Sequence, residues 1–287
     1  AADAPGLDSV ELMAAASRLA DADAGGGWVA RAAWLAIVPQ ISFREYDVPA
    51  MLPAALGITP AHMYQAPMAD GDSPVRHLND AANAIAAGQA SVCLLVGGEA
   101  VRTSARRAAA SGNAKNLFAG SLASASDLRR RYGLITPSEI YPFYENAARA
   151  AWGQSLAEGQ AETGEIWSRF SAVAAHAEGA WIKQPRTPAQ ITEVTADNRL
   201  LAFPFTKLMV ANSSVNQGAA LIVTSLAAAL SAGIAESRLV YIGAGASAHE
   251  DNEPLTRAEW TGTPAMQVAV EKVMELNGLT SKDLDHV

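Results

Sequence analysis

The sequence has a single cysteine, Cys93, among its 287 residues. One thiol cannot form an internal disulfide, and it cannot supply the several thiolates of a structural zinc site. Chains without disulfides are typical of a reducing compartment, so we expect a cytoplasmic protein. Cys93 itself lies in the apolar run "ASVCLLVGG", where we expect a small buried hydrophobic residue rather than a reactive thiol.

Long apolar segments and clusters of positive charge are also missing. No apolar run approaches the about 20 residues of a membrane-spanning helix, and the opening "AADAPGLDSV" does not have the pattern of a signal peptide. The net charge is −8, without a long basic run, so neither nucleic acid nor a membrane is an expected partner. The five histidines are scattered, with no pair at metal-ligand spacing, and we expect no metal site.

What the sequence does contain is a regular alternation of helical and strand-like patterns. Half of the residues are hydrophobic, which is typical of a globular chain. Short apolar runs between helices are typical of strands that are covered on both faces. Ser73 is a typical N-cap, followed by Pro74 at the first helical position. The expected elements are a helix in 7–27, a strand in 32–39, a helix in 47–57, a strand in 61–67, a helix in 73–88 and a strand in 90–98.

The alternation stops after residue 101. We predict an inserted, mostly helical domain in 105–204, with helices in 138–159 and 163–185 and loops in 186–205. Strand and helix patterns then resume in 218–233, and another strand is expected in 238–247. The tail, 262–287, repeats the helix, polar link and strand start of 9–38, which suggests duplicated α/β halves. The predicted domains are therefore an α/β domain of residues 1–104 and 205–238, the insertion 105–204, and the start of a second half in 239–287.

Four stretches in this order resemble the thiolase superfamily. They are "LNDAANAIAAGQASVCLLVGGEAVRTS", "YPFYENAARAAW", "MVANSSVNQGAALIVTS" and "AVEKVMELNGLTSKDLDHV". The nearest group is the thiolase-like proteins related to the sterol-carrier-type thiolases, often labelled acetyl-CoA acetyltransferases. The resemblance implies a thiolase-like α/β fold, a mixed sheet with helices on both faces, an inserted loop domain and a truncated second half. It also implies coenzyme A or acyl-CoA as a substrate rather than a permanently bound cofactor.

The same resemblance points to a missing nucleophile. Thiolases use a cysteine at the N-terminus of a buried helix, where the helix dipole favours a thiolate. The register of "AIAAGQAS" places that cysteine at Gly71, which has no side chain and cannot hold an acyl group. Ser73 is a weak alternative, either an acylated serine or a helix cap. His77, one turn into the helix, is either an acid–base group or a buried structural histidine.

Binding residues follow from the resemblance as well. The segment "ANSSVNQG" matches the run along the pantetheine arm of coenzyme A, which makes Ser213 and Ser214 candidate binding residues. The segment "EIYPFYEN" matches the cover of the acyl pocket, with Ile140, Tyr141 and Phe143 as candidate walls. The family commonly has histidine and methionine where this sequence has Glu139 and Ile140. The cluster Arg102, Arg106 and Arg107 is either a phosphate contact of coenzyme A or a solvated loop.

The flanks depart from the family pattern. Family members open with a central strand before the first helix, and their later catalytic loops correspond to positions beyond Val287. We therefore expect the sequence to be part of a longer polypeptide or to have lost both flanks. We also expect a sheet without that strand to leave unpaired backbone groups in the core.

Three functions remain open from the sequence. The first is an acyl-CoA-binding protein of the acyltransferase or carbon–carbon lyase class without its own cysteine nucleophile, its base being Tyr141 or a residue beyond Val287. The second is a non-catalytic subunit that pairs with a thiolase-like or small CoA-binding partner. The third is a conventional acetyl-CoA acetyltransferase, which requires a different register at Gly71. A homodimer or a hetero-oligomer is expected in each case.

Overall fold

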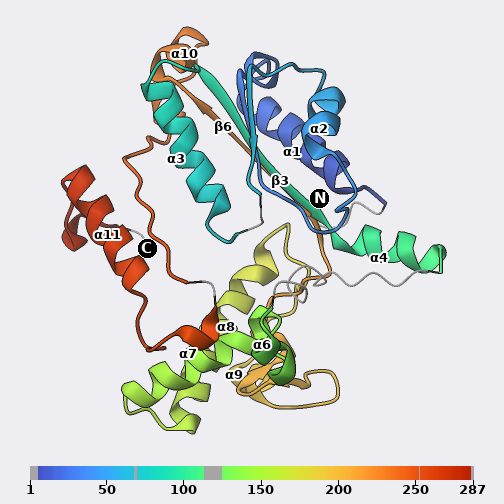
Figure 1. The fold of residues 1–287 in the computed structure, drawn as a ribbon, viewed down its shortest axis with the longest axis vertical. Helices are drawn as coiled ribbons and strands as arrows, with labels where there is room; N and C mark the ends of the chain where they lie inside the picture. Colours follow the sequence, from blue (N-terminus) through green and yellow to red (C-terminus); the bar gives the residue numbers. More distant parts are fainter. Residues whose placement is uncertain (1–5, 68–69, 113–124, 252, 286–287) are drawn as a thin grey trace. The chain divides into compact units, whose positions relative to one another are not determined.

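The structure is a computed structural model that describes residues 6–67, 70–112, 125–251 and 253–285. The chain divides into two compact units, which are described separately (Figure 1). The sheet unit comprises Asp3–Lys115, Ser214–Ser247 and Val268–Val287, and the helical unit comprises Asn116–Ser213 and Ala248–Gln267. The domain limits given above stay a prediction.

A four-stranded mixed sheet forms the centre of the sheet unit. Its strands are β1 (Trp34–Ile37), β2 (His62–Gln65), β3 (Val92–Ala100) and β6 (Asn216–Thr224), in the order β2-β1-β3-β6. Strands β2, β1 and β3 run parallel, and β6 is antiparallel to β3. The predicted α/β class is confirmed. The expected gap of unpaired backbone is wrong, because β1 pairs directly with β3, Leu35 opposite Leu94.

Helices cover both faces of this sheet. On one face, α1 (Ser9–Asp23) and α2 (Val48–Leu56) pack on alternate strand residues such as Leu35 and Leu94. On the other, α3 (Ser73–Ala86) packs on the intervening residues, among them Ala36 and Cys93 (Figure 1). This two-residue period is the geometry of a strand buried on both sides. The remaining helices of the unit include α4 (Val101–Ala110) and α10 (Leu226–Ser231), and α11 (Pro264–Asn277) begins in the helical unit.

Two glycines allow α1 to lie directly on the sheet. Gly98 of β3 and Gly218 of β6 are opposite one another in the ladder. A Cβ at Gly218 would stand 2.6 Å from the carbonyl oxygen of Leu12, and one at Gly98 would stand 3.0 Å from that of Ser9. Both obstacles are helix backbone, which cannot turn aside as a side chain can. The glycines therefore set the distance between α1 and the sheet.

Each helix of the helical unit begins at a Ser or Thr N-cap. They are α6 (Asp127–Tyr132), α7 (Pro137–Ala151), α8 (Leu156–His176) and α9 (Pro188–Thr192), beside a hairpin of β4 (Leu200–Ala202) and β5 (Phe205–Thr206). The predicted break between α7 and α8 is several residues late, because a capping box of Ser155 and Glu158 starts α8. The expected loop 186–205 instead contains α9 and part of the hairpin, with Thr187 and Gln190 capping the helix.

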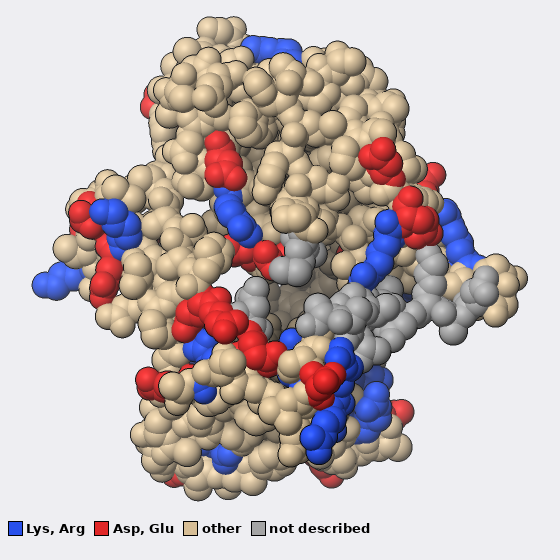
Figure 2. Space-filling view, in the orientation of Figure 1, with Lys and Arg blue, Asp and Glu red and all other residues tan. Residues whose placement is uncertain are grey.

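Short 3₁₀ turns complete the element list. They are η1 (Val29–Arg31), η2 (Lys207–Met209), η3 (Glu236–Arg238), η4 (Pro254–Thr256) and η5 (Ser281–Asp283). On the face in Figure 2, side chains of both charges are interspersed with uncharged ones. No helix in the described part of the chain has both the length and the apolar character needed to cross a bilayer.

The strand predicted in 238–247 does not form. Strands need a hydrogen-bonded neighbour, and no described strand pairs with this segment. Instead, the Asn277 amide makes both bonds to one residue: it accepts from the Ala244 N–H and donates to the Ala244 carbonyl, each at 2.9 Å. Asn79 accepts from the N–H of Gly245 at 3.2 Å. Two side chains from α3 and α11 thus hold a segment whose Val240 is 91% exposed.

Replacing Gly218 with alanine is expected to lower the free energy of unfolding by about 2 kcal/mol, since the new methyl group overlaps the backbone of α1. Urea denaturation measures the change. The matched control is Gly71→Ala, where a Cβ meets nothing within 4 Å and φ lies outside the left-handed region. An equal loss in both variants would contradict the close-packing explanation.

Candidate functional site

The start of α3 is the corner to which the resemblance assigns the chemistry. Gly71 and Asp72 form a turn that closes with a bond from the N–H of Ser73 to the carbonyl of Asp70, 3.2 Å. Ser73 is the first helical residue, so the prediction that it is the N-cap is wrong by one position. Its hydroxyl accepts from the N–H of Asp70 at 3.3 Å, and Asp72 at the cap position pairs with Arg76 at 2.9 Å instead of capping.

Gly71 is exposed on this corner. A Cβ there would meet no atom within 4 Å, and the backbone is not in the left-handed region that favours glycine. Neither space nor conformation therefore requires a glycine. A cysteine would fit at this position, beside a helix end that no side chain caps.

Ser73 and His77 are four residues apart on α3 but do not form a catalytic pair. The side chain of Ser73 is fully buried, and His77 is only 1% exposed. Among the described residues neither ring nitrogen of His77 has a hydrogen-bond partner, so no hydroxyl described here is activated by the imidazole. Instead, the ring of Tyr64 lies at 87° to that of His77, with centroids 5.4 Å apart.

Burial lowers the pKa of His77 from its ordinary value. The carboxylates of Asp80 and Asp72 and the nearby backbone of Ile37 act in the opposite direction, and Arg76 reinforces the lowering. The Ile37 backbone lies near the ring without reaching hydrogen-bonding geometry. Desolvation is the largest of these effects, so the neutral imidazole is favoured in the folded protein.

Cys93 is confirmed as a buried hydrophobic residue. Its side chain is inaccessible between β3 and α3, and burial raises the pKa of its thiol to about 11. Within the described residues its polar contact is a weak S–H bond to the carbonyl of Ala81, 3.9 Å. A thiol in this state is neither ionised nor reachable, so it does not replace the cysteine absent from Gly71.

The predicted coenzyme A contacts lie elsewhere. Ile140, Tyr141 and Phe143 are together on α7 in the helical unit, and Tyr141 is exposed. Ser213 ends one stretch of the helical unit and Ser214 begins one of the sheet unit, both on exposed backbone without regular structure. The structure therefore groups Gly71, Ser73 and His77 at one corner and the α7 residues in a second set.

An aromatic cluster supports the α7 set. Phe143 stacks on Trp260 with ring centroids 5.0 Å apart, and Tyr144 meets the same indole edge-on at 4.7 Å. The guanidinium of Arg257 lies 5.3 Å from the ring centre of Tyr144 and pairs with Glu250 at 3.4 Å. Phe143 is thus partly covered by the segment that carries Trp260. The sequence gives one signal of this cluster, a tryptophan in a polar loop, but it does not indicate which residues Trp260 contacts.

A polar network at the end of β3 was not foreseen either. The carboxylate of Glu99 accepts from the N–H groups of Ile41 and Ser42 and from the Ser42 hydroxyl, at 2.6–3.1 Å. Thr103 and the amide of Asn216 are bonded to each other twice, at 2.9 and 3.2 Å. These bonds hold the loop after β1 to the end of β3, and the start of β6 to the first turn of α4. The segment "GGE", which lies inside β3 and not in a turn, was the available signal.

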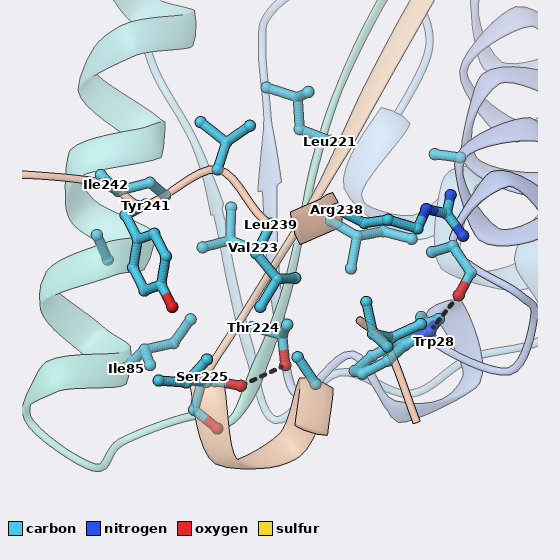
Figure 3. Close-up of a pocket in the computed structure, with 18 of the residues that line it drawn as sticks. Trp28, Ile85, Leu221, Val223, Thr224, Ser225, Arg238, Leu239, Tyr241 and Ile242 are labelled. Carbon is cyan, nitrogen blue, oxygen red and sulfur yellow. Dashed lines mark hydrogen bonds between the residues drawn. The ribbon is translucent and has the colours of Figure 1, made fainter. Parts of the chain in front are cut away.

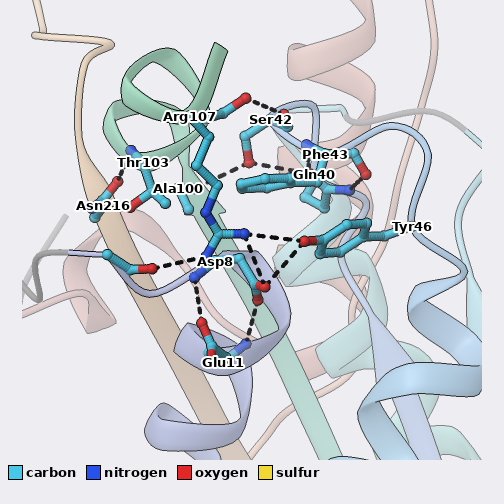
Figure 4. Close-up of polar contacts among 12 residues, drawn as sticks. Asp8, Glu11, Gln40, Ser42, Phe43, Tyr46, Ala100, Thr103, Arg107 and Asn216 are labelled. Atoms are coloured by element: carbon cyan, nitrogen blue, oxygen red, sulfur yellow. Dashed lines mark hydrogen bonds and ion pairs between the residues drawn. The ribbon is translucent and has the colours of Figure 1, made fainter. Parts of the chain in front are cut away.

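Arg107 belongs to this framework rather than to a phosphate site. Its guanidinium lies 3.6 Å from the carboxylate of Asp8, 3.3 Å from the hydroxyl of Tyr46 and 2.9 Å from the carbonyl of Gly6 (Figure 4). The alternative in which Arg107 contacts coenzyme A would require these bonds to break.

A second feature of the sheet unit is an apolar groove of about 620 Å³, shown in Figure 3. Strand β6, helix α10 and the segment 239–242 form most of its wall, and hydrocarbon side chains such as Leu221 and Ile242 dominate it. At one end Arg238 donates to the carbonyl of Asp23 at 2.9 Å. We call this surface the β6 groove.

Comparison with solved structures identifies the fold. The monomeric SCP2-thiolase like protein type 1 (STLP1) from Mycobacterium smegmatis matches 99% of this chain at 29% identity with a TM-score of 0.77. The chain is a relative of the thiolase superfamily. The Ltp2-ChsH2(DUF35) aldolase has the same fold, with a TM-score of 0.73 and 19% sequence identity. The match covers 98% of this chain and 68% of the aldolase chain. Neither a protein-family profile nor a curated protein matches the sequence.

This thiolase-like chain spans 57% of the length of STLP1. The likeness confirms the predicted thiolase-like fold. The roles of Gly71, Ser73, His77 and the coenzyme A residues stay predictions.

Cys93 is expected to resist alkylation in the folded protein, because its thiol is buried and protonated. Iodoacetamide at about pH 7.5 should leave it unmodified, and the same reagent in urea should label it fully, as read by mass spectrometry of the intact chain. Rapid labelling without denaturant would show an accessible thiolate.

Acid is expected to destabilise the protein through His77. Its folded pKa lies below the unfolded value of about 6.5, so the unfolded state takes up the proton first as the pH falls. The stability contribution is complete above about pH 6.5 and is lost below it. The urea midpoint should fall between pH 7.5 and pH 5, roughly the range around this value. His77→Phe keeps the ring and should flatten that part of the slope, while an unchanged slope would assign the effect to other groups.

Proposed function

We propose that this thiolase-like protein binds acyl-CoA and acts on carbon–carbon bonds without a cysteine-bound acyl intermediate. The observation that supports this most directly is Gly71, an exposed corner residue with room for a side chain and none present. The two other candidate nucleophiles, Ser73 and Cys93, have buried side chains. Covalent acyl transfer by these three positions is therefore disfavoured.

A retro-aldol reaction of a β-hydroxyacyl-CoA needs no nucleophile. A base removes the hydroxyl proton, and the oxygen forms a carbonyl with Cβ as the bond between Cα and Cβ breaks, which releases an aldehyde or ketone. The electron pair of the broken bond forms the thioester enolate, which then takes up a proton. Stabilising the enolate requires a positive potential, and the uncapped N-terminus of α3 supplies one. The base, a tyrosine such as Tyr141 or a residue beyond Val287, stays a prediction. Coenzyme A is bound here as part of the substrate.

Incubation with acetyl-CoA followed by peptide-mapped mass spectrometry tests the proposal. The parent protein should bind acetyl-CoA in a calorimeter yet give no acetylated peptide. Gly71→Cys should acquire an acetyl group at that position, since the site then regains a thiol at a helix N-terminus. Gly71→Ser offers a matched side chain with a much weaker nucleophile.

Three outcomes would contradict the proposal. Acetylation of Ser73 or Cys93 in the parent protein would show covalent transfer. Absence of acetyl-CoA binding at millimolar concentration would remove the substrate class. An unreactive Gly71→Cys protein that still binds acetyl-CoA would show that the register of the nucleophile is different.

A non-catalytic subunit is the second candidate, and the β6 groove favours it. Apolar side chains in and beside this groove are exposed in the sheet unit, Leu221 by 54% and Tyr241 by 63%. Solvated apolar surface of this kind is typical of a protein–protein contact. In the structurally similar Ltp2-ChsH2(DUF35) aldolase, a thiolase-fold chain is named together with a second component. A thiolase-like or small CoA-binding partner is the corresponding proposal here.

This second candidate is tested by purifying the protein from its native cell and measuring the mass of the complex by light scattering. A second polypeptide at fixed stoichiometry is expected, and Leu221→Asp should release it. Leu230→Asp is the control, because Leu230 is similarly exposed on α10 but does not line the groove. A single self-associating polypeptide that retains activity would argue against a hetero-oligomer.

A further inference from the structure

Strand β6 is an outer strand of the described sheet, and its free edge lacks the features that usually protect such an edge. It is nine residues long, pairs with β3 residue by residue without a bulge, and contains neither a charged residue nor a proline. The strand at the other edge, β2, has only four residues. Long uncharged edges offer their backbone groups to other chains, so native proteins usually shorten, charge or cover them. The β6 edge therefore needs a cover.

The alternation along β6 identifies the backbone groups that are left unpaired. Directly after the strand, the N–H of Ser225 donates to the carbonyl of Ser91 at 3.0 Å. The odd-numbered residues of β6 therefore direct their backbone groups toward β3. Those of Ala220 and Ile222 point away from the sheet, and among the described residues they have no hydrogen-bond partner.

Residues 239–245, which we call the strap, pass in front of this edge. At one end, Leu239 packs into the apolar cluster on the α1 side of the sheet. At the other end, Gly245 is bonded to Asn79 of α3, which covers the opposite side. Between these ends, residues 239–242 line the β6 groove beside the strand (Figure 3). The strap thus crosses from one helix layer to the other at the free side of β6.

Side-chain amides, rather than a strand ladder, hold the strap. The Asn277 amide bonds both backbone groups of Ala244, and Asn79 accepts from the N–H of Gly245. A Cβ at Gly243 would stand 2.5 Å from the amide oxygen of Asn277, and one at Gly245 would stand 2.5 Å from that of Asn79. The two glycines therefore admit the amides to the backbone. A segment held by a few hydrogen bonds near the surface can open locally while the sheet stays folded.

The sequence of β6 fits a second copy of itself. Its first half contains the small residues Gly218 and Ala219, and its second half contains the large residues Leu221 and Ile222. An antiparallel copy centred on Ala220 places Ile222 opposite Gly218 and Leu221 opposite Ala219, so that a large residue meets a small one on each face. The outward backbone groups of the two strands then pair as in any antiparallel sheet.

The helices beside β6 leave room for this pairing. Helix α1 rests on Gly98 of β3 and Gly218 of β6, so its axis lies over the space between these two strands. With strands about 4.8 Å apart, the α1 helices of two copies paired through β6 would lie about 10 Å apart, a usual distance between packed helices. The α1 residues that line the groove include Ala20 and Ala24, whose small side chains allow that approach.

We propose that the strap keeps β6 from pairing with β6 of a second copy, and that its release from Asn79 and Asn277 opens the edge to this partner. While the strap is in place, residues 239–242 occupy space beside β6 that the second strand needs. Pairing joins two four-stranded sheets into one continuous sheet. The proposal rests neither on acyl-CoA binding nor on a different polypeptide, because its partner is this chain itself.

Cysteine cross-linking tests the strand pairing. Ala220→Cys is introduced into the parent chain and into a strap-released variant, Asn79→Ala with Asn277→Ala, and a short bismaleimide joins thiols that lie close together. In the proposed pair, residue 220 faces its own copy with Cα atoms about 5.5 Å apart. Cross-linking should rise at least about tenfold when the strap is released, because three hydrogen bonds that hold it closed are lost. Cys93 is buried and should not react.

Thr224→Cys is the matched control on the same edge. In the proposed pair, Thr224 faces Asn216 of the other copy, so the two copies of residue 224 are separated by about 27 Å at about 3.4 Å per residue. The short reagent cannot span this distance. No cross-link through residue 224 is expected, whether the strap is held or released.

A proline tests whether the backbone edge makes the contact. Ala220→Pro removes an outward N–H and leaves the bonds to β3 in place, and proline is tolerated at such edge positions. Added to the strap-released variant, it should return the dimer dissociation constant, measured by light scattering, to that of the parent. Leu221→Lys puts a charge beside the edge and serves the same purpose if the proline variant does not fold.

Three results overturn the proposal. A folded strap-released variant may cross-link through residue 220 no more than the parent, in which case the strap does not control the edge. Equal cross-linking through residues 220 and 224 would indicate nonspecific aggregation. Self-association that survives both Ala220→Pro and Leu221→Lys would assign the contact to another surface. If the double variant does not fold, Asn79→Ala alone provides the comparison. The chain is purified alone and without acetyl-CoA, so both candidate functions are tested separately.

Discussion

The contact between α1 and the glycine pair of the sheet is the constraint on which the rest of the sheet unit depends. Because Gly98 and Gly218 lack side chains, the backbone of α1 rests on β3 and β6. That contact fixes the end of β3, where Glu99 holds the loop after β1 and where Thr103 meets Asn216. The N-terminus of α1 is held at the same place through Asp8 and Arg107.

Burial then decides which side chains are chemically available. On the opposite face of the sheet, α3 packs against Ala36 and Cys93. Ser73, His77 and Cys93 are all buried. A hydroxyl and a thiol are thereby withdrawn from solvent, while the exposed corner residue is a glycine. The side chains that remain accessible on α3 include Val75 and the carboxylate of Asp80. The contact between α3 and the sheet therefore decides which side chains of this region can react.

The sequence predicted what depends on periodicity and local chemistry. The strand of Cys93, the buried state of that residue and the alternation of the first 100 residues are each visible as apolar runs between caps. The start of α8 was misplaced because the predicted break between 159 and 163 lies inside the helix, where Pro188 and Thr192 of α9 pack against Gly164. The strand at 238–247 was predicted from apolar residues alone, and strand formation depends on a neighbour that a single segment cannot reveal. The Trp260 cluster and the hydrogen bonds of Glu99 depend on contacts between distant residues, which propensity does not encode.

The β3–β6 ladder has a consequence for how the chain folds. Its nine residue pairs join Val92–Ala100 to Asn216–Thr224, so the whole stretch with α6 to α9 is a loop that the ladder must close. Closing a long flexible loop costs conformational entropy before the pairing compensates for it, which slows folding. A compact insertion that folds on its own shortens the effective loop and brings its ends together. The Thr103–Asn216 pair lies at the two ends of that loop, so it is a contact that forms only when the loop is closed.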